Sequence, residues 1–135
     1  DGVNLAARLE GSCKTYGAQI IISEYTKSKL KGIYALRELD RIVVKGKTEP
    51  VSIFEVLDFH DEETFPARMD VVGHFSEGLN HYRSTDFDAA IKSFSAALEA
   101  NVNDVPSQLY IERCNLFKNT PPPAGWSGEW VMTEK

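Results

Sequence analysis

Hydrophobic residues at the start of the chain recur at the spacing of a helix. The apolar positions within residues 1–10 are Val3, Leu5, Ala6 and Leu9. This spacing predicts an amphipathic helix. Asn4 and Arg8 are four residues apart, so they lie one turn from each other on a neighbouring face. An amide and a guanidinium on a rigid element can bind phosphate or another oxyanion. The alternative is an ordinary amphipathic helix with a solvated polar side.

The next fifty residues carry the short apolar runs and turn residues of a small sheet. Gly11-Ser12 and Tyr16-Gly17 are break signals after the first helix, and Gly17 suits a helix C-cap. Ser23 can cap a short helix that Gly32 ends. We expect, in order, a strand at 18–23, a helix at 24–30, a strand at 33–39 that continues at 41–44, a turn at 45–47 and a hairpin partner at 51–57.

From residue 68 onward the apolar spacing becomes helical, after a polar, acidic linker at 59–67. One apolar stripe comprises Val71, Val72, Phe75, Leu79 and Tyr82, and a stronger one Phe87, Ala90, Ile91, Phe94, Ala97 and Leu98. Thr85 with Asp88 resembles a capping box at the start of the second helix. Asp104 and Pro106 predict the start of a third helix that runs to about residue 117.

Composition and charge are those of an ordinary globular protein. Hydrophobic residues make up 42% of the 135 residues and charged residues 26%, so disorder is not expected. The net charge of −5 argues against general affinity for nucleic acid. Residues 1–58 hold nine Lys/Arg against eight Asp/Glu, whereas residues 59–135 hold six against twelve. This asymmetry predicts two modules.

The cysteines and the lack of long apolar runs predict a cytoplasmic segment. Cys13 and Cys114 fall one in each module without a CxxC pair, so we expect two free thiols in a reducing compartment. No apolar run approaches the ~18 residues of a membrane span, and we expect no membrane contact by this segment, whereas the parent could be anchored in a membrane through upstream segments. The chain opens inside a predicted helix with no leader sequence, which we interpret as a piece of a longer protein.

Three stretches of the first module match a known family in order and spacing. They are DGVNLAARLE at residues 1–10, AQIIIS at 18–23 and ELDRIVVKGKTEPVSIFEV at 38–56. Together they resemble the final third of the catalytic domain of class III nucleotide cyclases, over about residues 1–58. The resemblance implies an α+β fold, in which this module is part of a ferredoxin-like domain with the order helix, strand, helix and β-hairpin.

The resemblance also implies an activity and roles for three residues. Cyclases of this class convert ATP or GTP to the 3′,5′-cyclic monophosphate and pyrophosphate, with two Mg²⁺ or Mn²⁺ ions held by two aspartates. Their catalytic domains pair head to tail, so a second protomer is the implied partner. Asn4 matches the asparagine that orients the ribose, Arg8 the arginine that stabilises charge on the α-phosphate, and Lys45 the lysine that binds the terminal phosphates. Such positioned groups suit phosphoryl transfer.

The physical case for Lys45 alone is weaker than the resemblance. A lysine beside Gly46 in a tight turn can reach an anion while the backbone comes close. Without the resemblance, Lys45 and Lys47 would be interpreted as solvated turn residues. With it, we expect Lys45 to bind phosphate and Lys47 to stay at the surface.

The family residues that bind metal and recognise the base have no counterpart here, because they lie upstream of the asparagine motif. We do not assign Asp1 to a metal. His74 and His81, two turns apart on a helix, are too distant to share an ion without further ligands. We therefore expect no metal site within the chain, leave the choice between ATP and GTP open, and expect this chain alone to be catalytically inactive.

The second module resembles one tetratricopeptide repeat followed by a third helix. The matching packing positions are Gly78, Tyr82, Asp86, Phe87, Ala90, Phe94 and Ala97. Small residues at such positions let two helices approach closely, although the tryptophan of the first repeat helix is missing. We expect a small all-α module over 68–135 that binds a protein partner or supports the cyclase dimer. The module resembles the C-terminal extension of many bacterial cyclases.

Three prolines at 121–123 and two tryptophans stand near the end of the chain. They could be a polyproline ligand for an aromatic groove, or an extended strap that lays Trp126 and Trp130 over the helices. We favour the strap, because a helical unit this small gains from apolar cover.

The sequence thus predicts the C-terminal part of a class III adenylate or guanylate cyclase with a helical extension. Two other interpretations stay open. The parent could be a degenerate cyclase-like domain that serves as a signalling scaffold, although a scaffold has no need of Asn4, Arg8 and Lys45 together. The helical module could also be a free-standing interaction module, which would then fold without residues 1–58.

Overall fold

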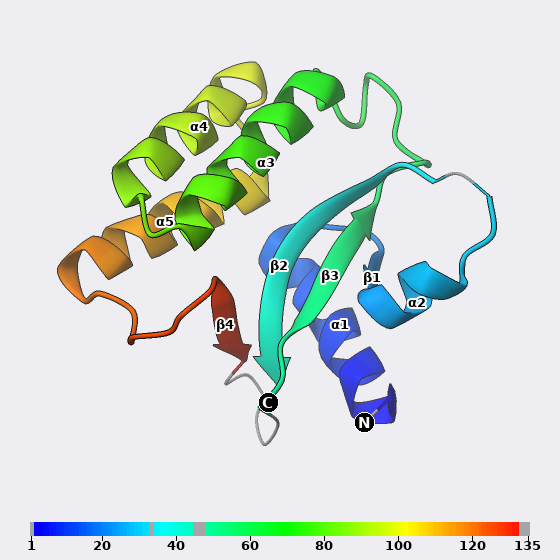
Figure 1. Cartoon of the computed structure of the whole chain (residues 1–135). Coiled ribbons are helices and arrows are strands. Elements are labelled where there is room, and N and C mark those ends of the chain that lie inside the picture. The colour runs from blue at the N-terminus through cyan, green and yellow to red at the C-terminus, as the bar shows by residue number, and fades with distance from the viewer. Residues whose placement is uncertain (1, 33, 45–47, 133–135) are drawn as a thin grey trace. The chain divides into compact units, whose positions relative to one another are not determined.

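The chain folds into two units (Figure 1). The computed structural model describes residues 2–32, 34–44 and 48–132. One unit consists of Asp1–Phe59 together with Glu129–Lys135, and the other of His60–Gly128. Within the described residues the units contain a four-stranded sheet and five helices, which agrees with the expected α+β class.

The first unit is a sheet with two helices packed against it. Its helices are α1 (Gly2–Tyr16) and α2 (Glu24–Lys29), and its strands are β1 (Ile21–Ser23), β2 (Leu36–Val44), β3 (Val51–Val56) and β4 (Glu129–Met132). The strand order is β1-β3-β2-β4. Strand β3 pairs antiparallel with β1 and β2, whereas β4 pairs parallel with β2. Helix α1 contacts β1 and β2.

Helix α1 is longer than the break signals predicted. It runs through Gly11, where we expected an interruption, and ends before Gly17, whose φ of +66° is the left-handed conformation of a C-cap. A single glycine costs a helix only about 1 kcal/mol. The inward residues Leu9, Ser12 and Tyr16 follow helical spacing and are buried, so tertiary packing outweighs that cost.

The elements after α1 follow the predicted order with shifted bounds. Ser23 caps α2 as predicted, because its hydroxyl oxygen accepts a hydrogen bond from the Thr26 N–H at 3.2 Å. Strand β1 is shorter than expected and begins at Ile21. Strand β2 begins at Leu36, within the run expected at 33–39, and continues without a break through 41–44, with a register shift between Glu38 and Asp40. The turn expected at 45–47 lies outside the described residues.

The second unit is a bundle of three helices with an aromatic core. They are α3 (Arg68–Arg83), α4 (Phe87–Ala100) and α5 (Val105–Asn119), and α4 packs against both others. The buried core comprises Phe75, Leu79, Tyr82, Ala90, Phe94, Tyr110 and Cys114. The predicted apolar stripes therefore point inward. The likeness to a tetratricopeptide repeat stays a prediction.

The capping residues of these helices differ from the predicted ones at α4. The cap of α4 is Asp86, whose Oδ1 accepts from the Ala89 N–H at 3.2 Å. The predicted capping box of Thr85 with Asp88 is wrong, because Thr85 has a φ of +64° and precedes the cap. Asp104 stands at the N-cap of α5 as predicted, but its carboxylate accepts from the Ser107 hydroxyl rather than from a backbone N–H.

The tail divides between the two units. Trp126 packs against Tyr82 and Phe117 of the helical core, with ring centroids 5.1 Å apart in each case. Trp130 lies instead in β4, opposite Ile42 of β2. The expected strap over the helices is therefore correct for Trp126 and wrong for Trp130, because the backbone of residues 129–132 joins the sheet.

Candidate functional site

The structure places two of the three predicted site residues on one helix. Asn4 and Arg8 are in the first two turns of α1, and the arrangement of their side chains lies outside what the structure describes. Lys45 directly follows β2 in the sequence and also lies outside the described residues. The structure therefore describes the helix that carries Asn4 and Arg8, and the strand that precedes Lys45.

Two polar contacts lie where α1 and β3 meet β2. The Tyr16 hydroxyl donates to Asp40 Oδ2 at 2.5 Å, and Asp40 Oδ1 accepts from the Arg41 N–H at 2.7 Å. Arg37 of β2 donates through Nη2 to Glu55 Oε1 of β3 at 2.9 Å. All four side chains that form these two pairs are almost completely buried.

The sequence reasoning missed these buried polar residues, although the sequence holds a signal for two of them. Arg37 and Glu55 each interrupt an apolar strand, IYALREL and VSIFEVL, with opposite charges. In a hairpin such residues can stand opposite each other, and the register pairs them directly. Nothing local in the sequence marks Tyr16 and Asp40 as partners, because they are 24 residues apart.

A hollow of about 500 Å³ lies beside α1, β1 and α2. Its wall includes Cys13, Ile20, Tyr25 and Lys29. Ile20 and Tyr25 are 45% and 54% exposed. Burial raises the pKa of the Cys13 thiol, so this cysteine is protonated and weakly nucleophilic near neutral pH. The surface that lines the hollow is mainly apolar.

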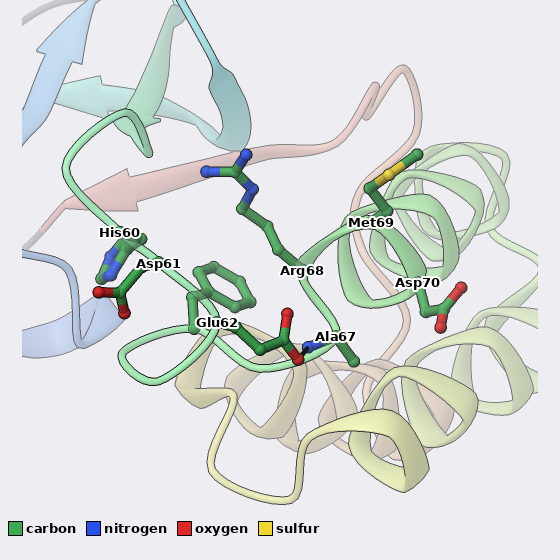
Figure 2. A pocket seen from close by; sticks show the side chains of 8 residues that line it. His60, Asp61, Glu62, Ala67, Arg68, Met69 and Asp70 are labelled. Atoms are coloured by element: carbon green, nitrogen blue, oxygen red, sulfur yellow. Dashed lines mark hydrogen bonds between the residues drawn. The ribbon is translucent and has the colours of Figure 1, made fainter.

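A second hollow, of about 320 Å³, lies in the helical unit where the chain enters α3 (Figure 2). Asp61, Glu62, Arg68 and Asp70 line it together with His60. A backbone hydrogen bond from Thr64 lowers the pKa of the Asp61 carboxyl, and Glu62 accepts from the Ala67 N–H at 3.1 Å. These carboxylates stabilise the turn at residues 61–67, where His60 Nδ1 also lies 3.1 Å from the Thr64 hydroxyl.

The described residues also bear on metal and membrane binding. They include no group of three His, Cys, Asp or Glu side chains that could hold a metal ion. Both cysteines are free thiols, Cys13 half-buried and Cys114 buried. Burial raises the pKa of Cys114 to about 12. Among the helices that the structure describes, none has the length and apolar character needed to cross a bilayer.

Two curated proteins with significant sequence similarity are both named adenylate cyclase. The chain is 33% identical over 117 residues to "Adenylate cyclase, terminal-differentiation specific" from Dictyostelium discoideum, a match that covers 84% of this chain and 6% of the relative. It is 46% identical over 59 residues to "Adenylate cyclase" from Anabaena cylindrica, covering 42% of this chain and 12% of the relative. No protein-family model and no solved structure matches significantly.

These relatives support the predicted relationship to cyclases. The chain spans only a small part of either relative's length. A match over 84% of this chain must extend from the sheet unit far into the helical unit, because neither unit holds that share of the residues. The Dictyostelium relative therefore shares sequence with both units. The prediction of a bacterial parent is not decided by these two relatives.

Proposed function

We propose that this chain is the C-terminal section of an adenylate cyclase that converts ATP to 3′,5′-cyclic AMP and pyrophosphate. The single observation that carries the proposal is the match of 84% of the chain to a protein named adenylate cyclase. The second relative carries the same name, which favours ATP over GTP. The residues that would choose the base lie outside this sequence.

Three residues of this chain would act on the nucleotide. Asn4 would orient the ribose, Arg8 would stabilise negative charge on the α-phosphate, and Lys45 would bind the terminal phosphates. Cations placed in advance where charge develops are the main protein contribution to phosphoryl transfer. Arg8 suits this role because a guanidinium stays charged and forms two parallel hydrogen bonds with phosphate.

The rest of the site would come from outside this chain. The metal-binding aspartates that the resemblance implies lie upstream of the asparagine motif, so the Mg²⁺ or Mn²⁺ ions that assist such chemistry would be held by other parts of the parent. A second protomer, paired head to tail, would complete the active site. We accordingly propose that the 135-residue chain alone is inactive.

The helical unit would be a tetratricopeptide-like element that binds a protein or supports the dimer. Its close crossing of α3 and α4 supports this proposal: a Cβ added at Gly78 would lie 2.6 Å from the Phe94 ring. Ala90 and Ala97 of α4 are also fully buried. The sequence that the Dictyostelium relative shares with this unit supports a helical unit that accompanies the cyclase section.

Replacement of Arg8 in the full-length parent tests the proposed function. Arg8→Ala should lower kcat for cyclic AMP formation by roughly a hundredfold or more, as expected for the loss of a transition-state cation. Lys14→Ala is the matched control, because it removes an exposed cation from the same helix and should leave kcat unchanged. Equal turnover of the Arg8→Ala variant and the wild type would overturn the assignment.

A further inference from the structure

A buried hydrogen bond joins helix α1 to strand β2. Tyr16 is the last residue of α1 and is 1% exposed, and Asp40 of β2 is fully buried. The Tyr16 hydroxyl donates to Asp40 Oδ2. The other carboxylate oxygen accepts from the Arg41 backbone N–H, so the carboxylate is held on its own strand while it binds the helix.

The β-bulge in β2 turns Asp40 toward this contact. Arg37 pairs with Glu55 and Asp40 pairs with Ile53. Glu55 and Ile53 are two residues apart on β3 and so face the same side of the sheet. Their partners on β2 therefore also share one side, although they are three residues apart. The extra residue, Leu39, makes this possible, and bulges commonly re-aim a side chain in this way.

A hydrogen bond of this kind fixes a helix in a way that apolar contacts do not. Burial of apolar surface is non-directional, so a helix packed by it alone can shift along its axis. A shift by one residue moves every position by about 1.5 Å and rotates it by about 100°. The contact of Tyr16 with Asp40 has a preferred distance and angle and opposes both movements.

We infer that Tyr16 and Asp40 are positioning residues of the catalytic centre. They fix α1, which carries Asn4 and Arg8, relative to β2, after which Lys45 follows in the sequence. This inference rests on the proposed function. Phosphoryl transfer depends on such placement, since a displacement of about 1 Å can cost as much as about a hundredfold in rate.

The test compares kcat and KM for ATP in the full-length parent and in its Tyr16→Phe variant. Phenylalanine keeps the buried ring and removes only the donor. We expect kcat per folded protein to fall about tenfold or more while KM changes less than about threefold, because misplacement of Arg8 weakens transition-state contacts more than ground-state binding. Tyr82→Phe, the same change at a fully buried tyrosine of the helical unit, is the control and should leave kcat unchanged.

A double-mutant cycle separates positioning from simple loss of stability. If Tyr16 acts through Asp40, the Tyr16→Phe/Asp40→Asn variant should have a kcat no lower than that of the single variant with the lower kcat. An unchanged kcat in Tyr16→Phe, with only a lower melting temperature, would overturn the inference, and so would additive losses in the double variant.

A readout without activity separates this inference from the proposed function. A wild-type parent that forms no cyclic AMP would contradict the proposed function alone. Hydrogen exchange of the 135-residue chain then tests the contact itself: Tyr16→Phe should speed exchange of α1 amides and leave those of α4 unchanged. Unchanged exchange in α1 would show that the hydrogen bond does not fix the helix and would overturn the inference.

Discussion

A buried ion pair links the two central strands of the sheet. Arg37 and Glu55 stand directly opposite each other, and their side chains are only 2% and 4% exposed. Nε and Nη2 of Arg37 both donate to the same carboxylate oxygen. Removing charges from water is costly, and the cost is offset only while both partners are present. The pair therefore makes the sheet sensitive to the loss of either side chain.

Glu55→Ala should lower the free energy of unfolding of the sheet unit by about 3–5 kcal/mol, because it leaves a buried guanidinium without its carboxylate. Urea unfolding of the 135-residue chain, followed by hydrogen exchange in β3, measures this loss. Asp88→Ala is the control, since its pair with Lys118 is exposed and should contribute less than about 1 kcal/mol. Equal losses in the two variants would show that the buried pair contributes no more to stability than the exposed pair.

The predicted site residues were found through resemblance rather than through geometry. Asn4, Arg8 and Lys45 belong to stretches whose order and spacing match a family. The buried contact of Tyr16 with Asp40 was not predictable, since the bulge at Leu39 decides which way Asp40 faces. Side chains alternate between the two faces of a regular strand, so Arg37 and Asp40, three residues apart, would be expected on opposite faces. The sequence pattern therefore gave no reason to place Asp40 on the side of the sheet that it occupies.

At the scale of elements, the crossing of α3 and α4 depends on one glycine. A Cβ at Gly78 would lie 2.6–2.8 Å from three atoms of the Phe94 ring, and Phe94 is fully buried. Gly73, also within α3, has nothing within 4 Å of an added Cβ. A side chain at position 78 would therefore clash with Phe94, whereas position 73 has room for one.

Gly78→Ala should destabilise the helical unit by about 1–3 kcal/mol through overpacking. Gly73→Ala should stabilise it by about 0.5–1 kcal/mol, because alanine loses less backbone entropy in a helix. Thermal unfolding of the 135-residue chain, monitored by circular dichroism at 222 nm, compares the two variants. Shifts of the same sign would show that the close crossing does not limit residue 78.

Element types were more predictable than element ends. Ser23 and Asp104 were recognised as caps because short polar side chains before a helical pattern are strong local signals. The start of α4 was misplaced because Thr85 and Asp86 are both good capping residues, and the left-handed backbone of Thr85 leaves the cap to Asp86. Gly11 shows the converse error, in which packing overrides a local break signal.

At the scale of the whole chain, the sequence did not predict strand β4. Residues 129–132 pair in parallel with residues 41–44, although the three helices of the second unit lie between these two strands in the sequence. A pairing of such separation leaves no local pattern, and four residues are too few for a periodicity argument. The two tail tryptophans consequently have different surroundings, Trp126 in the aromatic core and Trp130 in the sheet.

This strand makes the helical unit a long insertion between β3 and β4. The chain leaves the sheet after Val56 and returns at Glu129. The expectation that one module spans residues 68–135 differs from the observed units in this respect, since 129–135 group with the sheet. The free-standing module of residues 68–135, given above as an alternative, would therefore separate β4 from its partner strand β2.

Cyclic AMP formation by the full-length parent tests the proposed cyclase activity most directly. The parent is incubated with ATP, and separately with GTP, in the presence of Mg²⁺ or Mn²⁺, beside the 135-residue chain. We predict cyclic AMP and pyrophosphate from ATP with the parent, and no product from the chain alone. No cyclic nucleotide from the parent under any of these conditions would contradict the cyclase assignment and favour the degenerate signalling scaffold.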